Sequence, residues 1–131
     1  PGHKALSIQR LPVSDKLRNI AESFCELAEN KNLNYQLDIE PDIEWNTDIS
    51  CFNKIANNLI SNAFKYTPEE GTITVSLKTE NQHLTLSISN SGKGIAKENL
   101  SKIFDRYKIL DSFEMNGKNS RNGLGLATFD R

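Results

Sequence analysis

Amide side chains recur at helical spacing in one stretch of the chain. Asn58 and Asn62 are four residues apart, so on a helix they share one face. Lys65 and Tyr66 follow three and four residues after Asn62. Amide oxygens suit Mg²⁺, which bridges phosphates, while a lysine neutralises phosphate charge and a tyrosine packs against a base. The pattern fits a polar ligand surface, and the alternative is a row of asparagines that are merely solvated.

Two short glycine turns support the ligand surface. Gly92 and Gly94 follow an alternating apolar segment, where glycine lets a ligand approach the backbone. Gly123 and Gly125 lie in a segment that we expect to be a loop entering a helix, whose free N–H groups favour phosphate. The polar stretch 111–122 between the two turns has the composition of a lid. Each glycine pair alone is weak evidence, but the three features together indicate one nucleotide site.

The elements that must position these residues follow from the spacing of the apolar residues. Helical spacing predicts helices, which we place at 14–30, at 48–65 and around 100–104. Alternating spacing predicts strands, which we place at 6–8, 34–39, 73–77 and 84–88. Two helices that precede a hairpin indicate an α+β fold, a two-layer α/β sandwich with helices on one face of a mixed sheet.

Polar residues mark where the two long helices begin. Ser14 and Asp48 each precede a helical run, and both residue types accept backbone hydrogen bonds at a helix N-cap. Apolar residues at helical spacing, Leu27 among them, predict the buried face of the first helix. Thr67 and Pro68 then end the second helix, and Gly71 allows a turn.

The composition excludes several classes of protein. The 131 residues suit one domain, and 37% hydrophobic and 25% charged residues are typical of a soluble one. A net charge of −1 gives no overall field that favours nucleic acid or an anionic membrane. No apolar run reaches the roughly 20 residues that span a bilayer. Cys25 and Cys51 lie in apolar-periodic stretches, so we expect two buried, reduced thiols.

Four motifs together resemble those of one protein family. NNLISNAFKYTP resembles the asparagine box of histidine kinases, and NSGKGI resembles their first glycine box. KIFDRY resembles the phenylalanine box, and NGLGLA resembles the second glycine box. The boxes occur in the family's order, and the resemblance covers nearly all of residues 1–131, with 1–4 read as a linker or tag remnant. It implies the Bergerat ATP-binding fold, with ATP and Mg²⁺ as its ligands.

The resemblance also implies roles for individual residues. Asn62 would coordinate Mg²⁺, and Asn58 would help to hold the metal or its water. Lys65 would approach the phosphates, and Tyr66 would pack against the adenine or the ribose. The phosphates would be cradled by the second glycine box, which comprises Gly123, Leu124, Gly125 and Leu126.

The first glycine box departs from the family's pattern. Gly92 and Gly94 would shape the adenine end of the site, but the family's aspartate before them is replaced by Asn90. The amide oxygen of Asn90 can still accept a hydrogen bond from the exocyclic amine of adenine, while its NH₂ group donates elsewhere. A neutral acceptor makes a weaker bond than an ionised one, so we expect adenine recognition with altered affinity.

The chain also stops at Arg131, soon after the second glycine box. Family members continue through a helix and further strands. We therefore expect the sheet to lack its C-terminal strands and to leave an edge open.

The residue at position 58 favours phosphoryl transfer over hydrolysis. In the hydrolytic relatives a glutamate matches Asn58 and activates water, whereas an amide is a poor general base at neutral pH. The resemblance therefore implies a kinase domain that gives the γ-phosphate to a histidine. His3 and His83 lie outside the family's acceptor motif, so no catalytic residue is assigned within this chain. The isolated chain is expected to bind ATP without phosphorylating itself.

The resemblance further implies the partners and the location of the parent protein. The acceptor histidine would belong to a dimerisation and phosphotransfer domain of the same protein, and a response regulator receiver domain would act downstream. The parent is expected to be a bacterial two-component sensor, a homodimer anchored in the inner membrane with this domain in the cytoplasm, and a hybrid sensor by the look of its boxes. The alternative is a degenerate, non-catalytic module that binds nucleotide or a protein partner.

Overall fold

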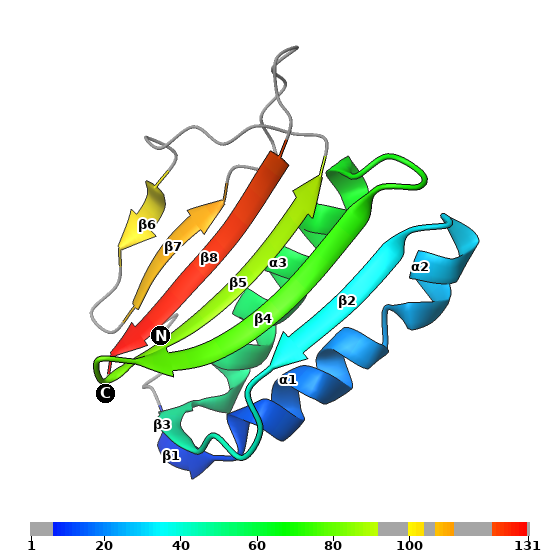
Figure 1. The fold of residues 1–131 in the computed structure, drawn as a ribbon. Helices are drawn as coiled ribbons and strands as arrows, with labels where there is room; N and C mark the ends of the chain where they lie inside the picture. Colours follow the sequence, from blue (N-terminus) through cyan, green and yellow to red (C-terminus); the bar gives the residue numbers. More distant parts are fainter. Residues whose placement is uncertain (1–6, 92–99, 104–106, 112–121, 131) are drawn as a thin grey trace, which may run out of the picture.

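The computed structural model describes residues 7–91, 100–103, 107–111 and 122–130 (Figure 1). The helices are α1 (Val13–Glu22), α2 (Cys25–Asn30) and α3 (Ile49–Tyr66). The strands are β1 (Ile8–Leu11), β2 (Asn34–Ile39), β3 (Trp45–Asp48), β4 (Thr72–Glu80), β5 (His83–Ser91), β6 (Leu100–Ile103), β7 (Tyr107–Asp111) and β8 (Asn122–Asp130).

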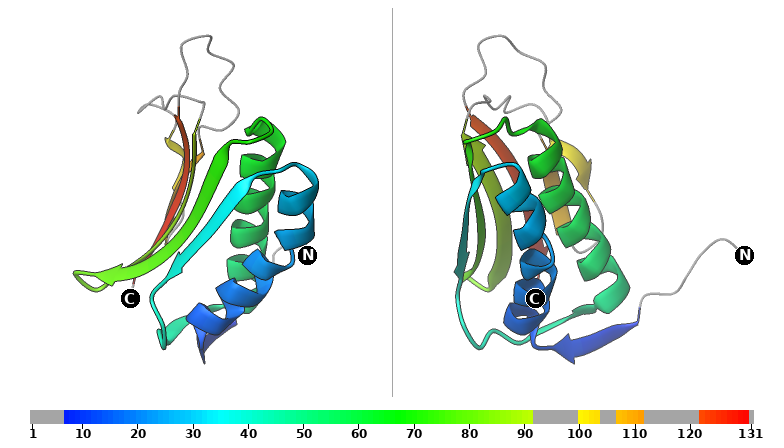
Figure 2. Two further views of the ribbon diagram at one scale, coloured as in Figure 1. Left: turned by 45° about the vertical axis from the view of Figure 1, so that its right-hand side comes forward. Right: turned by 90° about the vertical axis from the view of Figure 1, so that its right-hand side faces the viewer.

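A six-stranded mixed sheet forms one layer and the helices form the other. The strand order is β2-β4-β5-β8-β7-β6, in which β2 is parallel to β4 and the other pairs are antiparallel. A separate antiparallel pair, β1 with β3, lies where the chain enters α1 and α3. Figure 2 shows α1, α2 and α3 on the same side of the curved sheet. The expected two-layer α/β sandwich is therefore confirmed.

The core lies between α3 and the sheet. Alternation places Ile73, Val75 and Leu77 of β4 on the helix side, where they are fully buried. Phe52 of α3 is also fully buried and its ring lies 5.6 Å from that of Phe129 in β8. The intervening residues of the strands are hydroxyl-rich and partly exposed on the outer face. This pattern keeps α3 against the middle of the sheet with one face turned away from it.

The hairpin of β4 and β5 forms as the alternation predicts. Asn81 and Gln82 connect the strands, and both have positive φ, 52° and 65°. Two successive positive φ values match the twist of a two-residue hairpin turn. The register pairs Ile73 with Asn90, which brings the start of the first glycine box to the end of the sheet where α3 finishes.

The first predicted helix is in fact two helices, and Ser14 is not its N-cap. The Ser23 N–H donates to both Asn19 O and Ile20 O, which closes α1 before α2 begins. Ser14 is buried inside the first turn, where its Oγ donates to Glu40 O and accepts from Ile43 N. A partner distant in the sequence thus replaces the expected local cap.

Two apolar-face expectations are also corrected. Leu27 is 42% exposed because the chain turns between α1 and α2, so the second helix presents a different face. Cys25 is exposed and Cys51 is half-buried, so the prediction of two buried thiols is wrong, although both are free. Strand β3 was not predicted, because its residues Trp45–Asp48 precede α3 with no turn signal between.

The C-terminal part of the chain differs most from expectation. Residues 100–103 form strand β6 rather than a helix, and the helix expected after the second glycine box is strand β8. From Gly125 to Phe129, buried residues alternate with partly exposed ones, a period of two that fits a strand. β8 pairs with β5 along the full length of β5. Among the described residues, no helix is long and apolar enough to cross a membrane.

Candidate functional site

The predicted amide face lies in the C-terminal half of α3. The helix begins after Asp48, whose side chain accepts the N–H of Cys51 at 3.0 Å, so the predicted N-cap is confirmed. Asn58 is exposed and Asn62 half-buried, on a side of α3 other than the one that packs on the sheet. The spacing of four residues brings the two amides one above the other.

The end of the same helix carries the predicted lysine and tyrosine. Lys65 is exposed and Tyr66 is half-buried, and the Lys65 Nζ lies 5.1 Å from the centroid of the Tyr66 ring. This distance is within the range of a cation–π contact. A cation and an aromatic ring therefore follow the two amides at the end of α3. Amide oxygens suit a metal ion that is bound to phosphate, and an aromatic ring suits a planar base.

One asparagine of the run serves the helix itself. Asn57 Nδ2 donates to Asn53 O at 2.8 Å, one turn back. Ser61 Oγ likewise donates to Asn58 O at 3.2 Å. Asn57 is exposed and its amide N–H bonds to its own helix, so this asparagine needs no ligand to explain it.

Thr67 joins the asparagine box to the first glycine box. Its side chain is buried, and its Oγ1 donates to Ala63 O at 2.6 Å. Because a hydroxyl has one hydrogen, the same oxygen meets Asn90 as an acceptor, and Asn90 Nδ2 is the donor. Asn90 is itself only 4% exposed. The two predicted boxes are thus brought together by a residue whose role the sequence analysis did not identify.

Two further residues lie around Thr67: Gly71, which the sequence analysis assigned to a turn, and Lys31, for which it gave no role. Lys31 Nζ donates to Phe64 O at 2.7 Å and to Thr67 O at 3.1 Å. A Cβ on Gly71 would lie 2.7 Å from Thr67 Cγ2, so glycine at this position lets the turn close against Thr67. The available signal was Pro68, which has no N–H to give to the carbonyl four residues before it.

The glycine boxes have different outcomes. Gly92 and Gly94 lie outside the described residues, so their expected roles stay predictions. The second box lies inside β8, where Gly123 pairs with Asn90 and Gly125 with Ile88. The loop and helix start that we expected there are wrong, because the edge of β5 offers this segment a complete backbone ladder.

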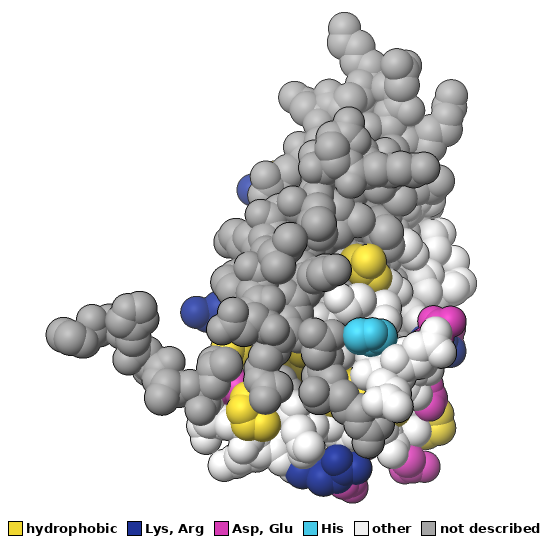
Figure 3. All heavy atoms as spheres, turned by 90° about the vertical axis from the view of Figure 1, so that its left-hand side faces the viewer, with side chains coloured by type: hydrophobic (Ala, Val, Ile, Leu, Met, Phe, Trp, Pro, Cys, Tyr) yellow, Lys and Arg dark blue, Asp and Glu magenta, His cyan; other side chains and the backbone are white. Residues whose placement is uncertain are grey.

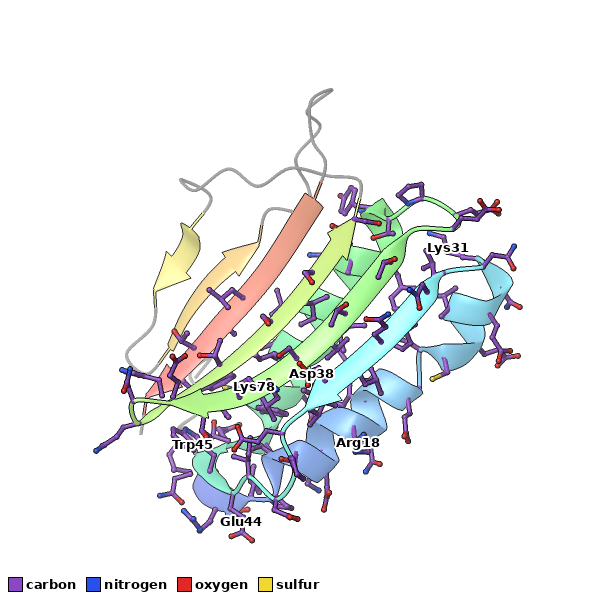
Figure 4. The ribbon with its side chains drawn as sticks, in the orientation of Figure 1. Arg18, Lys31, Asp38, Glu44, Trp45 and Lys78 are labelled. Atoms are coloured by element: carbon purple, nitrogen blue, oxygen red, sulfur yellow. The ribbon has the colours of Figure 1, made fainter. Side chains whose placement is uncertain are left out.

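A groove lies elsewhere on the molecule. It encloses about 430 Å³ between the β1–β3 pair and the turn of the β4–β5 hairpin, and none of the predicted site residues lines it. Figure 4 shows two of its residues, Glu44 and Trp45, at the end of the molecule opposite Lys31. Within it Arg10 and Glu44 form an ion pair at 3.2 Å, and Glu40 accepts the Thr79 N–H at 3.0 Å. The predicted site residues of α3 lie toward the other end of that helix.

His83 lies at the surface. It is the first residue of β5, beside the hairpin turn, and its side chain is the exposed histidine in Figure 3. Its position in a strand agrees with the prediction that it lies outside a helical acceptor motif.

Known proteins share both the sequence and the fold. The family model described as histidine kinase-, DNA gyrase B-, and HSP90-like ATPase matches residues 47–131, more than half of the chain. Histidine kinase P4 of Formosa agariphila is 39% identical over 111 residues, which are 84% of this chain and 8% of that protein. Sensor histidine kinase TmoS of Ectopseudomonas mendocina is 32% identical over 123 residues, 93% of this chain and 12% of that protein. The chain thus spans about a tenth of the length of these relatives.

Solved structures agree with the fold. The catalytic domain of histidine kinase ThkA, in a nucleotide-free form, has a TM-score of 0.77 at 18% identity and covers 95% of this chain and 96% of that chain. ThkA in complex with response regulator protein TrrA has a TM-score of 0.74 at 19% identity, over 98% of this chain and 43% of that chain.

The chain belongs to the family of histidine kinase-, DNA gyrase B-, and HSP90-like ATPases. Within that family it is the ATPase domain of a two-component histidine kinase, as its relatives and its fold show. The resemblance that the four boxes indicated is therefore confirmed.

Proposed function

We propose that this domain binds Mg-ATP and donates the γ-phosphate to a histidine on a separate dimerisation and phosphotransfer domain. The observation that carries this function is the grouping at the end of α3. There Asn58, Asn62 and Lys65 follow one another along the helix, and Thr67 ties the helix to Asn90. Phosphoryl transfer depends mainly on positioning and on charge stabilisation, which such a rigid, polar surface supplies.

Each side chain of α3 has a role in this proposal. Asn62 is the metal ligand, with Asn58 holding the metal or its water, and Mg²⁺ would neutralise charge on the phosphates. Lys65 approaches the phosphates, and Tyr66 packs against adenine or ribose. The exposure of Asn58 and Lys65 and the half-buried positions of the other two leave these side chains accessible to a ligand.

The glycine boxes complete the proposed site. Asn90 accepts a hydrogen bond from adenine, with Gly92 and Gly94 beside the base. The phosphate contacts are assigned to the backbone of the second box, namely Gly123, Leu124, Gly125 and Leu126. In the structure these backbone groups lie in the ladder between β8 and β5. Binding phosphate there requires the first residues of β8 to separate from β5.

The amide at position 58 supports transfer rather than hydrolysis. A carboxylate at that point of α3 could accept a proton from water, whereas the Asn58 amide is a poor general base. The acceptor histidine comes from the dimerisation domain of the parent, and a receiver domain of a response regulator takes the phosphoryl group next. We place the domain in the cytoplasm, in a parent that is a membrane-anchored homodimer.

Similar proteins provide support for these partners. The solved complex of ThkA with response regulator protein TrrA concerns such a pair. Full-length ShkA was solved with AMPPNP, and its chain has a TM-score of 0.73 to this one at 17% identity. The likeness of this chain to ThkA and ShkA is a likeness of fold.

Binding of AMPPNP to the chain, with and without Mg²⁺, tests the proposal first. We expect tight binding only with Mg²⁺, and we expect Asn62→Ala to abolish most of the dependence on Mg²⁺. The matched control is Asn53→Ala, because Asn53 lies on a different face of α3 from Asn62. This variant should keep the dependence of AMPPNP binding on Mg²⁺. The parent's dimerisation domain added with labelled ATP should then acquire acid-labile label that the isolated chain does not acquire. A chain that binds no nucleotide would instead support a non-catalytic module.

A further inference from the structure

The last turn of α3 cannot satisfy its own carbonyl groups. A helix leaves its final four carbonyl oxygens without intrahelical partners. In α3 the first of these, Ala63 O, accepts the Thr67 hydroxyl at 2.6 Å. The next, Phe64 O, would ordinarily meet the N–H of residue 68, but that residue is Pro68 and has no N–H. The helix that carries the candidate site therefore needs a donor from elsewhere.

Lys31, the residue that follows α2, supplies that donor. Its Nζ lies 2.7 Å from Phe64 O and 3.1 Å from Thr67 O, so one ammonium group bridges the last turn of α3 and the residue after it. The Lys31 N–H also donates to Leu27 O at 3.1 Å, which anchors the lysine backbone to the end of α2. Figure 4 shows Lys31 at the turn between α2 and β2. Hydrogen bonds that involve a charged group are stronger than neutral ones.

Packing holds the two helix ends at the distance that this contact needs. The Phe64 ring lies 5.3 Å from the Phe24 ring and 5.1 Å from the Tyr35 ring. The Tyr35 hydroxyl donates to Ala21 O at 2.7 Å, which ties β2 to α1. These contacts keep the end of α3 near the chain segment that carries Lys31.

The contact continues to the first glycine box. Thr67 is held through its carbonyl by Lys31 and through its hydroxyl by Ala63 O. The same hydroxyl oxygen accepts Asn90 Nδ2, so the orientation of the Asn90 amide depends on where Thr67 is held. Hydrogen bonds therefore link the Lys31 side chain to the backbone carbonyl of Thr67, and the Thr67 hydroxyl to Asn90, the residue proposed to recognise adenine.

We propose that Lys31 is a positioning residue for base recognition, acting on Asn90 through Thr67. This inference rests on the proposed function, because it assigns Asn90 to the adenine. The ammonium group fixes the carbonyl of Thr67, which orients the hydroxyl that in turn holds the Asn90 amide. Lys31 itself need not touch the nucleotide.

The test compares variants of Lys31 for AMPPNP and GMPPNP binding at a temperature where all of them are folded. Lys31→Met keeps the apolar stem but removes the charge, and it should weaken AMPPNP binding by about tenfold. GMPPNP binding should change much less, so the preference for the adenine nucleotide narrows. Lys31→Arg keeps donors for both carbonyls and should restore the preference. Lys78→Met is the matched control, because Lys78 forms only an exposed ion pair with Asp38 at 3.0 Å.

The outcomes separate this inference from the proposed function. The positioning role would be overturned if Lys31→Met bound AMPPNP as tightly as the wild type, kept its preference for AMPPNP over GMPPNP, and differed only in a lower unfolding temperature. That result would leave the proposed function intact. A wild-type chain that binds neither nucleotide would overturn both. If Lys31→Met does not fold, Lys31→Gln keeps a neutral donor and carries the same expectation of a narrowed preference.

Discussion

The two ends of α3 are held in different ways. At the first end the cap is local, because Asp48 accepts the N–H of Cys51, three residues later, at 3.0 Å. At the other end the donor is Lys31, which is 33 residues away from Phe64 in the sequence. The first turn of α3 can therefore be capped by a residue that is its neighbour in the sequence. The last turn, which follows Asn58 and Asn62 of the candidate site, is complete only after α2 and β2 have packed against it.

The aromatic residues near the two ends allow the largest test of this comparison. Phe64→Ala and Phe52→Ala each remove a buried ring, and each should lower the free energy of unfolding by about 3–5 kcal/mol. Only Phe64 packs on Phe24 and Tyr35, next to the carbonyl that Lys31 holds. Below the unfolding temperature, therefore, only Phe64→Ala should weaken AMPPNP binding. Denaturant unfolding and titration calorimetry measure the two effects, and equal loss of binding in both variants would contradict the comparison.

The turn after α3 is the next place to test it. Gly71→Ala would place a Cβ 2.7 Å from Thr67 Cγ2 and 3.0 Å from Pro68 O. Relief of this overlap should cost about 1–3 kcal/mol, as overpacking does elsewhere. It should also move Thr67 and reduce the preference for AMPPNP over GMPPNP. Thermal unfolding with both nucleotides checks this, and an unchanged preference would show that Thr67 tolerates the movement.

Asn90→Asp tests the direction of the hydrogen bonds at the same end. A carboxylate cannot donate to Thr67 Oγ1, so the hydroxyl must turn toward it and leave Ala63 O. We expect the free energy of unfolding to fall by about 1–3 kcal/mol, the range for an unsatisfied buried group. AMPPNP should bind more tightly, because an ionised acceptor makes a stronger bond with the adenine amine. Asn90→Ala should lose both stability and affinity, and unchanged affinity there would remove Asn90 from the site.

The smallest effect is expected at the first end and only in acid. Hydrogen bonds from the backbone N–H groups of Ser7 and then of Cys51 hold the pKa of Asp48 below its ordinary value of 3.8. A group with a lowered pKa stabilises the folded state above its unfolded pKa, and the stabilisation is lost as the pH falls through the folded value. The unfolding temperature should therefore drop below about pH 4. Asp48→Asn should show a smaller drop in this window, and an identical pH profile would exclude the contribution of Asp48.

The features that depend on local interactions were predicted from the sequence, and those that depend on distant partners were not. Asp48, the period of α3 and the β4–β5 hairpin were predicted, because caps, helical faces and two-residue turns act over a few residues. The predicted N-cap role of Ser14 was wrong, because its hydroxyl bonds to Glu40 and Ile43 instead. The predicted burial of Leu27 was wrong, because the chain turns before that residue. Patterns over a few neighbouring residues do not identify partners that come close only when the chain folds.

The second glycine box shows how a tertiary partner changes secondary structure. Its glycines suggested a loop and the start of a helix, yet residues 122–130 form β8 against the whole of β5. Glycine is permissive in either conformation, so the pairing available at the edge of β5 decides between them. The order of the boxes identified the family correctly, even though the secondary structure predicted for the second glycine box was wrong.

The sequence by itself determined the family, the two-layer sandwich and the row of Asn58, Asn62 and Lys65 along α3. These follow from motif order and from apolar periodicity, which are properties of neighbouring residues. Only the tertiary structure decided that Lys31 completes the end of α3 and that Thr67 joins this end to Asn90. The physical reason is that Pro68 deprives the last turn of a local donor, so the missing hydrogen bond has to come from a residue that packing brings near.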